Sequence, residues 1–191
     1  KLILKHIKLF WVLKKLFAIL SFFFVSNLIS QEINWITMDK ALELQKKVPK
    51  NIIMDVYTEW CGPCKIMDKN TFQNPDVVNF INNNFYAIKF NAEGNDIINY
   101  KDRKFDNPRY VKKDYGRNSS HNFTRYIGVN AYPTIVFFDK QANPIAPIRG
   151  YLGPNQIEIY LKLFKDDDYK TIKSQDDFKK FMSSFESEFK I

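Results

Sequence analysis

Residues 51–64, NIIMDVYTEWCGPC, decide the fold of this chain. The first seven are mostly apolar or β-branched, which is typical of a short strand buried on both faces. Apolar residues recur at helical spacing after Cys64, so the strand leads to two cysteines at the start of a helix. A Cys-x-x-Cys pair in this position indicates either half of a metal site or a redox centre.

The number of available ligands separates these two kinds of site. A structural zinc ion needs four Cys or His ligands, whereas the chain contains only Cys61, Cys64 and two histidines, His6 and His121. His6 lies in a leader that we expect to be removed, so the ligand set stays incomplete. We therefore predict no metal and no bound cofactor, and a redox-active Cys61–Cys64 disulfide instead.

The start of a helix suits Cys61 for attack on a disulfide. The thiolate is the nucleophile in disulfide exchange, and the unpaired N–H groups and positive dipole end of a helix stabilise an anion there. Cys64, one turn deeper, is placed to attack the resulting mixed disulfide. Pro63 suits the first turn because it lacks an N–H, and Gly62 leaves the approach to Cys61 open. We expect Cys61 to be exposed enough to reach a partner.

The remaining pattern predicts an α/β domain. The chain has 191 residues, of which 45% are hydrophobic and 26% charged, a composition that excludes disorder and low-complexity fibres. Hydrophobic spacing predicts helices over about 37–47, 64–81 with a break near Pro75, and 155–164, and strands over 51–57, 85–90, 134–138 and 145–149.

A long polar segment, residues 94–125, interrupts this pattern. Basic and aromatic residues are interleaved in it, a spacing that can bind single-stranded nucleic acid or form a solvated, partly helical loop. We favour the loop and expect no nucleic-acid partner. The aromatic residues concerned are Tyr100, Phe105, Tyr110, Tyr115 and Phe123. In the C-terminal extension, 166–191, the spacing of Phe and Met predicts an amphipathic helix.

Much of the formal charge of +8 lies in the N-terminal leader, so it does not indicate an acidic binding partner. Five lysines and no acid lie in residues 1–30, and without them 24 basic residues face 21 acidic ones. The uncharged run 16–31 follows these lysines, a pattern typical of a secretory signal peptide. Retention as a membrane anchor is the alternative, although a spanning helix usually needs about 20 apolar residues. We predict a signal peptide over 1–30 and an exported, periplasmic or secreted, monomeric domain over 31–165.

Two motifs resemble the thioredoxin family: residues 54–65, MDVYTEWCGPCK, and residues 131–134, AYPT, before an apolar strand. Residues 70–77, NTFQNPDV, are most similar to the C-terminal periplasmic domain of the membrane thiol:disulfide interchange reductase and to its small secreted relatives. The resemblance covers about residues 34–164. It implies a thioredoxin-like fold, with a central mixed β-sheet flanked by helices, an insertion before a cis-proline loop and an extra C-terminal helix.

The resemblance also implies roles for residues around the cysteines. Asp55 corresponds to a buried acid that handles the proton when Cys64 attacks, and burial would raise its pKa. Lys89 matches a lysine that can pair with this acid, with a solvated strand lysine as the alternative. Pro133 matches a cis-proline beside which an extended substrate docks. The other substrate-binding residues are expected to be Trp60, Gly62, Pro63, Tyr132 and Gly150.

This resemblance and the leader together predict an exported thiol:disulfide oxidoreductase. We expect it to reduce protein disulfides and to be recharged by a membrane electron donor. One alternative is the reverse activity, that of an oxidase or isomerase of the same fold. Another is a redox-silent, chaperone-like module that holds partners in the groove at Tyr132 and Pro133 and on the basic insertion.

Cleavage of the leader close to Ser30 is expected to leave Gln31 at or near the N-terminus of the mature protein, because the charged and then apolar segment ends there. Mass spectrometry of the protein purified from its natural host checks this. A full-length chain that stays in the membrane fraction would show that the segment is an anchor instead.

Overall fold

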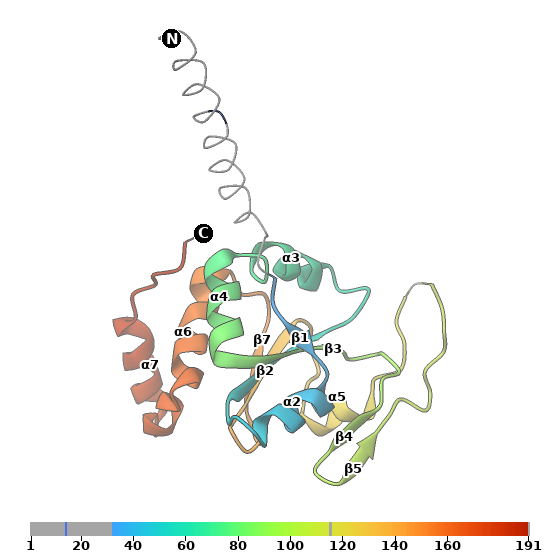
Figure 1. The fold of residues 1–191 in the computed structure, drawn as a ribbon. Coiled ribbons are helices and arrows are strands. Elements are labelled where there is room, and N and C mark those ends of the chain that lie inside the picture. The colour runs from blue at the N-terminus through green and yellow to red at the C-terminus, as the bar shows by residue number, and fades with distance from the viewer. Residues whose placement is uncertain (1–13, 15–31, 115, 191) are drawn as a thin grey trace, which may run out of the picture. The chain divides into compact units, whose positions relative to one another are not determined.

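The computed structural model describes residue 14 and residues 32–114 and 116–190. Apart from Lys14, the predicted signal peptide lies outside the described residues. Glu32–Ile191 forms one compact unit, in which helices lie on both faces of a sheet (Figure 1). In this described part, no helix is long and apolar enough to cross a membrane.

The central sheet is mixed and has the strand order β1-β3-β2-β6-β7. Its strands are β1 (Trp35–Ile36), β2 (Asn51–Tyr57), β3 (Phe85–Asn91), β6 (Thr134–Phe138) and β7 (Pro144–Arg149). Strand β2 lies in the middle, parallel to β3 and antiparallel to β6. The four strands predicted from the sequence are confirmed, whereas β1 is too short to leave a hydrophobic pattern.

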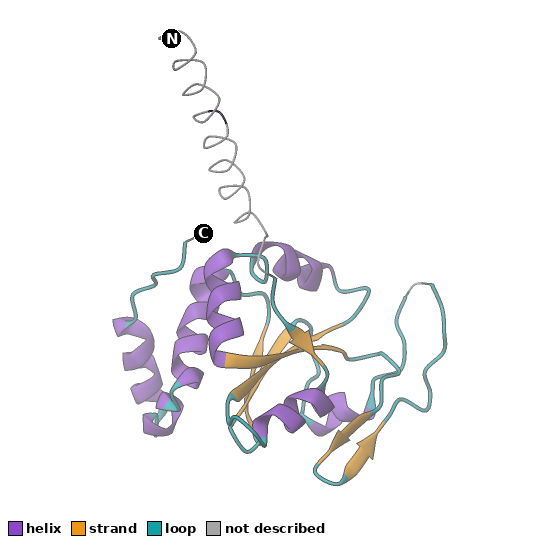
Figure 2. Cartoon of the chain, in the orientation of Figure 1, coloured by secondary structure: helices purple, strands orange, loops and turns teal. Residues whose placement is uncertain are grey.

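The helices cover both faces of this sheet (Figure 2). They are α2 (Met38–Gln45), α3 (Gly62–Asn70), α4 (Pro75–Asn84), α5 (Asn122–Tyr126), α6 (Pro154–Lys165) and α7 (Gln175–Ser184), with a short 3₁₀ helix, η1 (Asp168–Thr171). Thr37 caps α2 as predicted. The predicted break near Pro75 separates α3 from α4, because Asn74 caps α4 and Pro75 fits its first turn.

Side chains of β2 point alternately to the two faces of the sheet, and this alternation places Asp55. Ile52, Met54 and Val56 belong to the core on the α2 side of the sheet, whereas Ile53 belongs to the core on the side of α3, α4 and α6. Because successive side chains of a strand point to opposite faces, Asp55 shares the face of Ile53 and lies on the α3 side.

The insertion over 94–125 differs from the expected solvated loop. It contains a hairpin of β4 (Ile98–Tyr100) and β5 (Arg103–Phe105) and the helix α5. Tyr100, Phe105 and Phe123 are at most 5% exposed and belong to the core on the α2 side. The expectation is therefore wrong for these rings, because they contribute apolar burial to the fold and are not free to stack on bases. A loop remains between Phe105 and Asn122.

The C-terminal extension contains the predicted amphipathic helix as α7. Phe178, Phe181 and Phe189 pack against the core on the α3 side. The fully buried Glu158 of α6 accepts hydrogen bonds from the backbone N–H groups of residues 188 and 189 and from Lys162 and Ser187. Burial opposes the charge of Glu158, but these hydrogen bonds lower its pKa. The buried carboxylate therefore fixes the end of the chain to the domain.

Candidate active site

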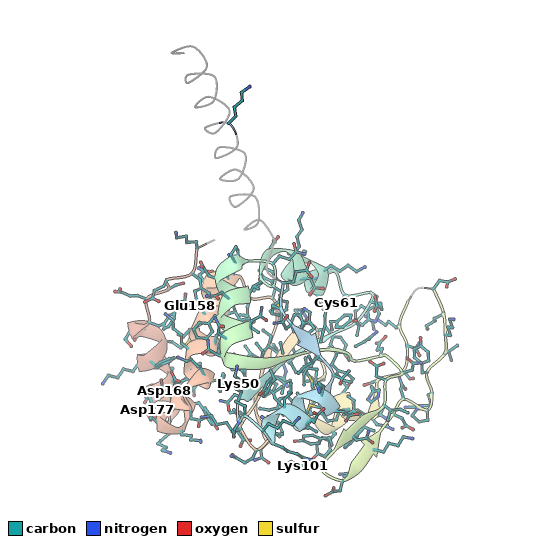
Figure 3. The ribbon with its side chains drawn as sticks, in the orientation of Figure 1. Lys50, Cys61, Lys101, Glu158, Asp168 and Asp177 are labelled. Carbon is teal, nitrogen blue, oxygen red and sulfur yellow. A yellow bond between two sulfur atoms is a disulfide. The ribbon has the colours of Figure 1, made fainter. Side chains whose placement is uncertain are left out.

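The two cysteines form a disulfide at the start of α3. Their sulfur atoms lie 2.01 Å apart and their Cα atoms 5.3 Å apart. Cys61 is the N-cap, and its Sγ accepts a hydrogen bond of 3.2 Å from the backbone N–H of Cys64. Figure 3 shows Cys61 beside this end of α3. The predicted placement of Cys61 at a helix N-terminus is thus found, and the N–H group there is available to stabilise a thiolate.

The exposure of Cys61 differs from our expectation. In this disulfide form Cys61 is only 2% exposed and Cys64 only 3%. The reason is that the Cys61 sulfur is bonded to Cys64 and turned towards the backbone of the first helical turn. The exposed residues here are their neighbours Trp60, Gly62 and Pro63.

Asp55 lies buried on β2, in register with Lys89 of β3. It is 2% exposed, its Oδ2 lies 3.5 Å from Nζ of Lys89, and its Oδ1 accepts no hydrogen bond from any described group. The pKa of Asp55 is raised to about 7, chiefly by burial; the nearby Lys89 opposes this rise, and the neighbouring carboxylate of Asp68 adds to it. A carboxyl group with this pKa can take up or release a proton near neutrality.

Sequence reasoning missed Asp68 of α3, which completes this charged group. Its Oδ1 accepts a hydrogen bond from Nζ of Lys89, so one lysine bridges two carboxylates. The Lys89 ammonium also lies within 6 Å of the rings of Trp35, Tyr57 and Phe72. A signal for Asp68 was present, because it follows Cys64 by four residues and such pairs share one face of a helix.

The loop before β6 holds Tyr132 and Pro133, and the predicted Gly150 adjoins this loop from the end of β7. The Tyr132–Pro133 peptide bond is cis, as the resemblance implied. Tyr132 packs edge to face on Trp60, with ring centroids 5.9 Å apart. The backbone N–H of Gly150, at the end of β7, donates to the Pro133 carbonyl at 2.9 Å. Its φ of +94° favours glycine at this position. The structure thus brings Trp60 and the Tyr132–Pro133 loop together.

The site offers nothing that resembles a metal centre. Within residues 14, 32–114 and 116–190, no three His, Cys, Asp or Glu side chains are grouped as metal ligands. His121 lies in the insertion, where Nδ1 accepts from the N–H of Phe123 and Nε2 lies 2.8 Å from the carbonyl oxygen of Asp96. Both of its ring nitrogens are thus engaged in structural hydrogen bonds.

Comparison with known proteins fits this geometry. The profile of the thioredoxin-like domain family matches residues 38–165. The chain belongs to this family. This thioredoxin-like domain is similar in structure to a thioredoxin-fold protein from Helicobacter pylori, with a TM-score of 0.54 and 18% identity over 76% of this chain and 94% of that one. It is also similar to a thioredoxin from Thermus thermophilus, with a TM-score of 0.50 and 15% identity over 69% and 85% of the two chains.

Among curated proteins, the thioredoxin-like domain matches the thiol:disulfide interchange protein DsbD of Pectobacterium atrosepticum. The two are 25% identical over 120 residues, which are 62% of this chain and 17% of that protein. DsbD of Haemophilus influenzae is 23% identical over 146 residues, 72% of this chain and 21% of that protein. The chain therefore spans about a fifth of the length of these relatives.

Replacement of Asp55 by asparagine is expected to stabilise the oxidised protein at alkaline pH. The unfolded chain releases the Asp55 proton near its ordinary pKa of 3.8, whereas the folded protein retains it up to about 7. The wild type therefore loses stability as the pH rises between these values, by at most about 4 kcal/mol. Denaturant unfolding at about pH 4.5 and about pH 8 measures the difference from Asp55→Asn.

Asp176→Asn is the matched control for this experiment, because Asp176 is almost fully exposed on α7. It is expected to change the stability little at either pH. A difference between wild type and Asp55→Asn that does not grow with pH would mean that Asp55 is charged in the folded protein.

Proposed function

We propose that this domain is an exported thiol:disulfide oxidoreductase that reduces disulfide bonds in proteins. The observation that carries the proposal is the Cys61–Cys64 disulfide at the start of α3, on the strand–helix unit that also holds the buried Asp55. This arrangement combines an attacking sulfur, a resolving sulfur and a proton carrier with a pKa near neutrality.

Reduction of a substrate proceeds in two exchanges. The Cys61 thiolate attacks one sulfur of the substrate disulfide, so that a mixed disulfide forms and the other substrate sulfur leaves as a thiolate. Cys64 then loses its proton and attacks the Cys61 sulfur, which releases the second substrate thiolate. Two electrons pass to the substrate, and the domain is left with the disulfide that the structure contains.

Asp55 is the proposed acceptor of the Cys64 proton. It accepts a proton only in its charged form, which is populated as the pH rises through about 7. Burial opposes the charged form most strongly, Lys89 favours this form, and the carboxylate of Asp68 opposes it. The resolving step is therefore expected to accelerate as the pH rises through neutrality.

The residues between the cysteines support the reducing direction. A disulfide becomes a strong oxidant when its reduced form is stabilised, mainly by favourable contacts of the attacking thiolate. Neither Gly62 nor Pro63 carries a side-chain donor or a positive charge. In an oxidising compartment such a reductant needs a protein that donates electrons to it. The matches to DsbD, which is named as a thiol:disulfide interchange protein, support a donor that also acts by thiol–disulfide exchange.

Serine variants distinguish the roles of the two cysteines. Cys64→Ser is expected to accumulate mixed disulfides with substrate proteins, because the attacking sulfur remains and the resolving one is lost. Cys61→Ser is expected to accumulate few, since the helix start stabilises a thiolate at the N-cap, Cys61, whereas Cys64 lies within the helix. Non-reducing electrophoresis followed by mass spectrometry detects the adducts. Equal trapping by both variants would contradict the assignment.

The reduction potential of the Cys61–Cys64 pair is expected at about −230 to −280 mV, near that of thioredoxin. The physical reason is the lack of side-chain donors on Gly62 and Pro63. Equilibration of the purified domain with glutathione buffers measures it. A potential above about −180 mV would favour an oxidase or isomerase of the same fold.

A further inference from the structure

One end of the loop in the insertion, at Arg117 and Asn118, reaches the surroundings of Trp60 beside the disulfide. Arg117 stacks over the ring of Trp60, with its guanidinium carbon 4.5 Å from the ring centroid. Nε1 of the same ring donates to Glu93 at 2.9 Å, and the backbone N–H of Asn118 donates to the same Glu93 oxygen at 2.6 Å. The insertion therefore reaches the site at Trp60, the residue that directly precedes Cys61.

Hydrogen bonds at its base hold this loop in place. The side-chain amide of Asn118 exchanges two hydrogen bonds with the backbone of Val111, at 2.6 and 3.1 Å. Asn107 is buried and donates to the carbonyls of Gly94 and Ser119, and the Ser119 hydroxyl donates back to it. Arg117 directly precedes Asn118, one of these fixed residues, so its side chain is presented with a smaller loss of conformational entropy on binding.

The outward charges of this loop are mainly basic. Arg109, Lys112, Lys113 and Arg117 are exposed, and among the described residues none of them forms a salt bridge with a carboxylate. The acids that face the same region are Asp114, Glu59 and Glu93. Glu93 is engaged by Trp60 and Asn118, and Glu59 by Tyr57 and Asn91. These two carboxylates therefore already have donors, and the loop itself carries a single acid, Asp114.

Arg117 is the member of this set with the geometry for recognition. A guanidinium that stacks on an aromatic ring keeps the donors at its edge free, and these donors match the two oxygens of a carboxylate. We propose that Arg117 selects disulfide partners that carry an Asp or Glu side chain next to one of their cysteines. This inference rests on the proposed function, and it identifies the kind of partner that the same site accepts.

Three disulfide peptides that differ only at the residue next to one cysteine test this selection. That residue is Asp, Lys or Ser, and kcat/KM for reduction is measured with each peptide at low ionic strength. The wild type is expected to prefer the Asp peptide over the Lys peptide about tenfold. The preference is expected to shrink at high salt, because exposed charges are screened.

Substitutions in the domain test whether Arg117 causes the preference for the Asp peptide. Arg117→Gln is expected to remove most of the ratio, and Arg117→Glu to invert it. Loss of the contact with Trp60 would affect all three peptides alike, so the ratio reports on charge recognition and not on packing. Lys104→Gln is the matched control, because Lys104 is an exposed basic residue of β5 in the same insertion. It is expected to keep the ratio of the wild type.

The outcomes separate this inference from the proposed function. Reduction of all three peptides at equal rates, or an unchanged ratio in Arg117→Gln, would overturn the selection by Arg117 and leave the reductase intact. Failure of the wild type to reduce even the Ser peptide would overturn the proposed function itself.

Discussion

A carboxyl group lies on the middle strand of the sheet, where a charge costs more free energy than at the surface. Asp55 is almost fully buried, and one of its oxygens accepts no hydrogen bond from the described residues. The chain tolerates it there because burial raises its pKa to about 7, so that the group is largely neutral below this pH and shares its proton near neutrality. Lys89, bridged to Asp68 on α3, compensates the charge that remains.

The position of the disulfide follows from the same strand. Strand β2 ends at Tyr57, and a turn closed by a hydrogen bond of 3.1 Å from the N–H of Cys61 to the carbonyl of Thr58 leads into α3. The apolar strand thus fixes the start of the helix, and the helix places the backbone N–H of Cys64 at the sulfur of Cys61. Asp68, on the same helix, forms a salt bridge with Lys89 of the sheet. One strand–helix unit therefore carries both sulfurs and both carboxylates.

The strands and helices around this unit were predictable because each has a strong local signal. The run 51–57 is apolar enough to be buried on both faces, and Asn74 and Pro75 mark the start of α4. The hairpin β4–β5 was missed, since each of its strands has three residues and charged positions surround Tyr100 and Phe105. Only packing against α5 and the sheet shows that these rings are core, and such contacts are absent from a local pattern.

At the site, the two cysteines, Asp55 and the cis-proline loop were found from the motif and its family resemblance. The contact of the insertion with Trp60 was not, because Arg117 and Trp60 lie far apart in the sequence and meet only through folding. The limited exposure of Cys61 was also unexpected, since it depends on the disulfide that holds its sulfur against the helix. The features of the site that could not be predicted therefore depend on contacts that form only when the chain folds and the disulfide closes.

The most direct test of this account is a titration of the reduced protein. The ultraviolet absorbance of the thiolate is followed with pH in Cys64→Ser, in which Cys61 is the only thiol. The account predicts that Cys61 ionises below the ordinary thiol pKa, because the first N–H groups of α3 stabilise its anion. Ionisation at or above the ordinary thiol value would show that the helix start does not activate Cys61, and would contradict the proposed chemistry.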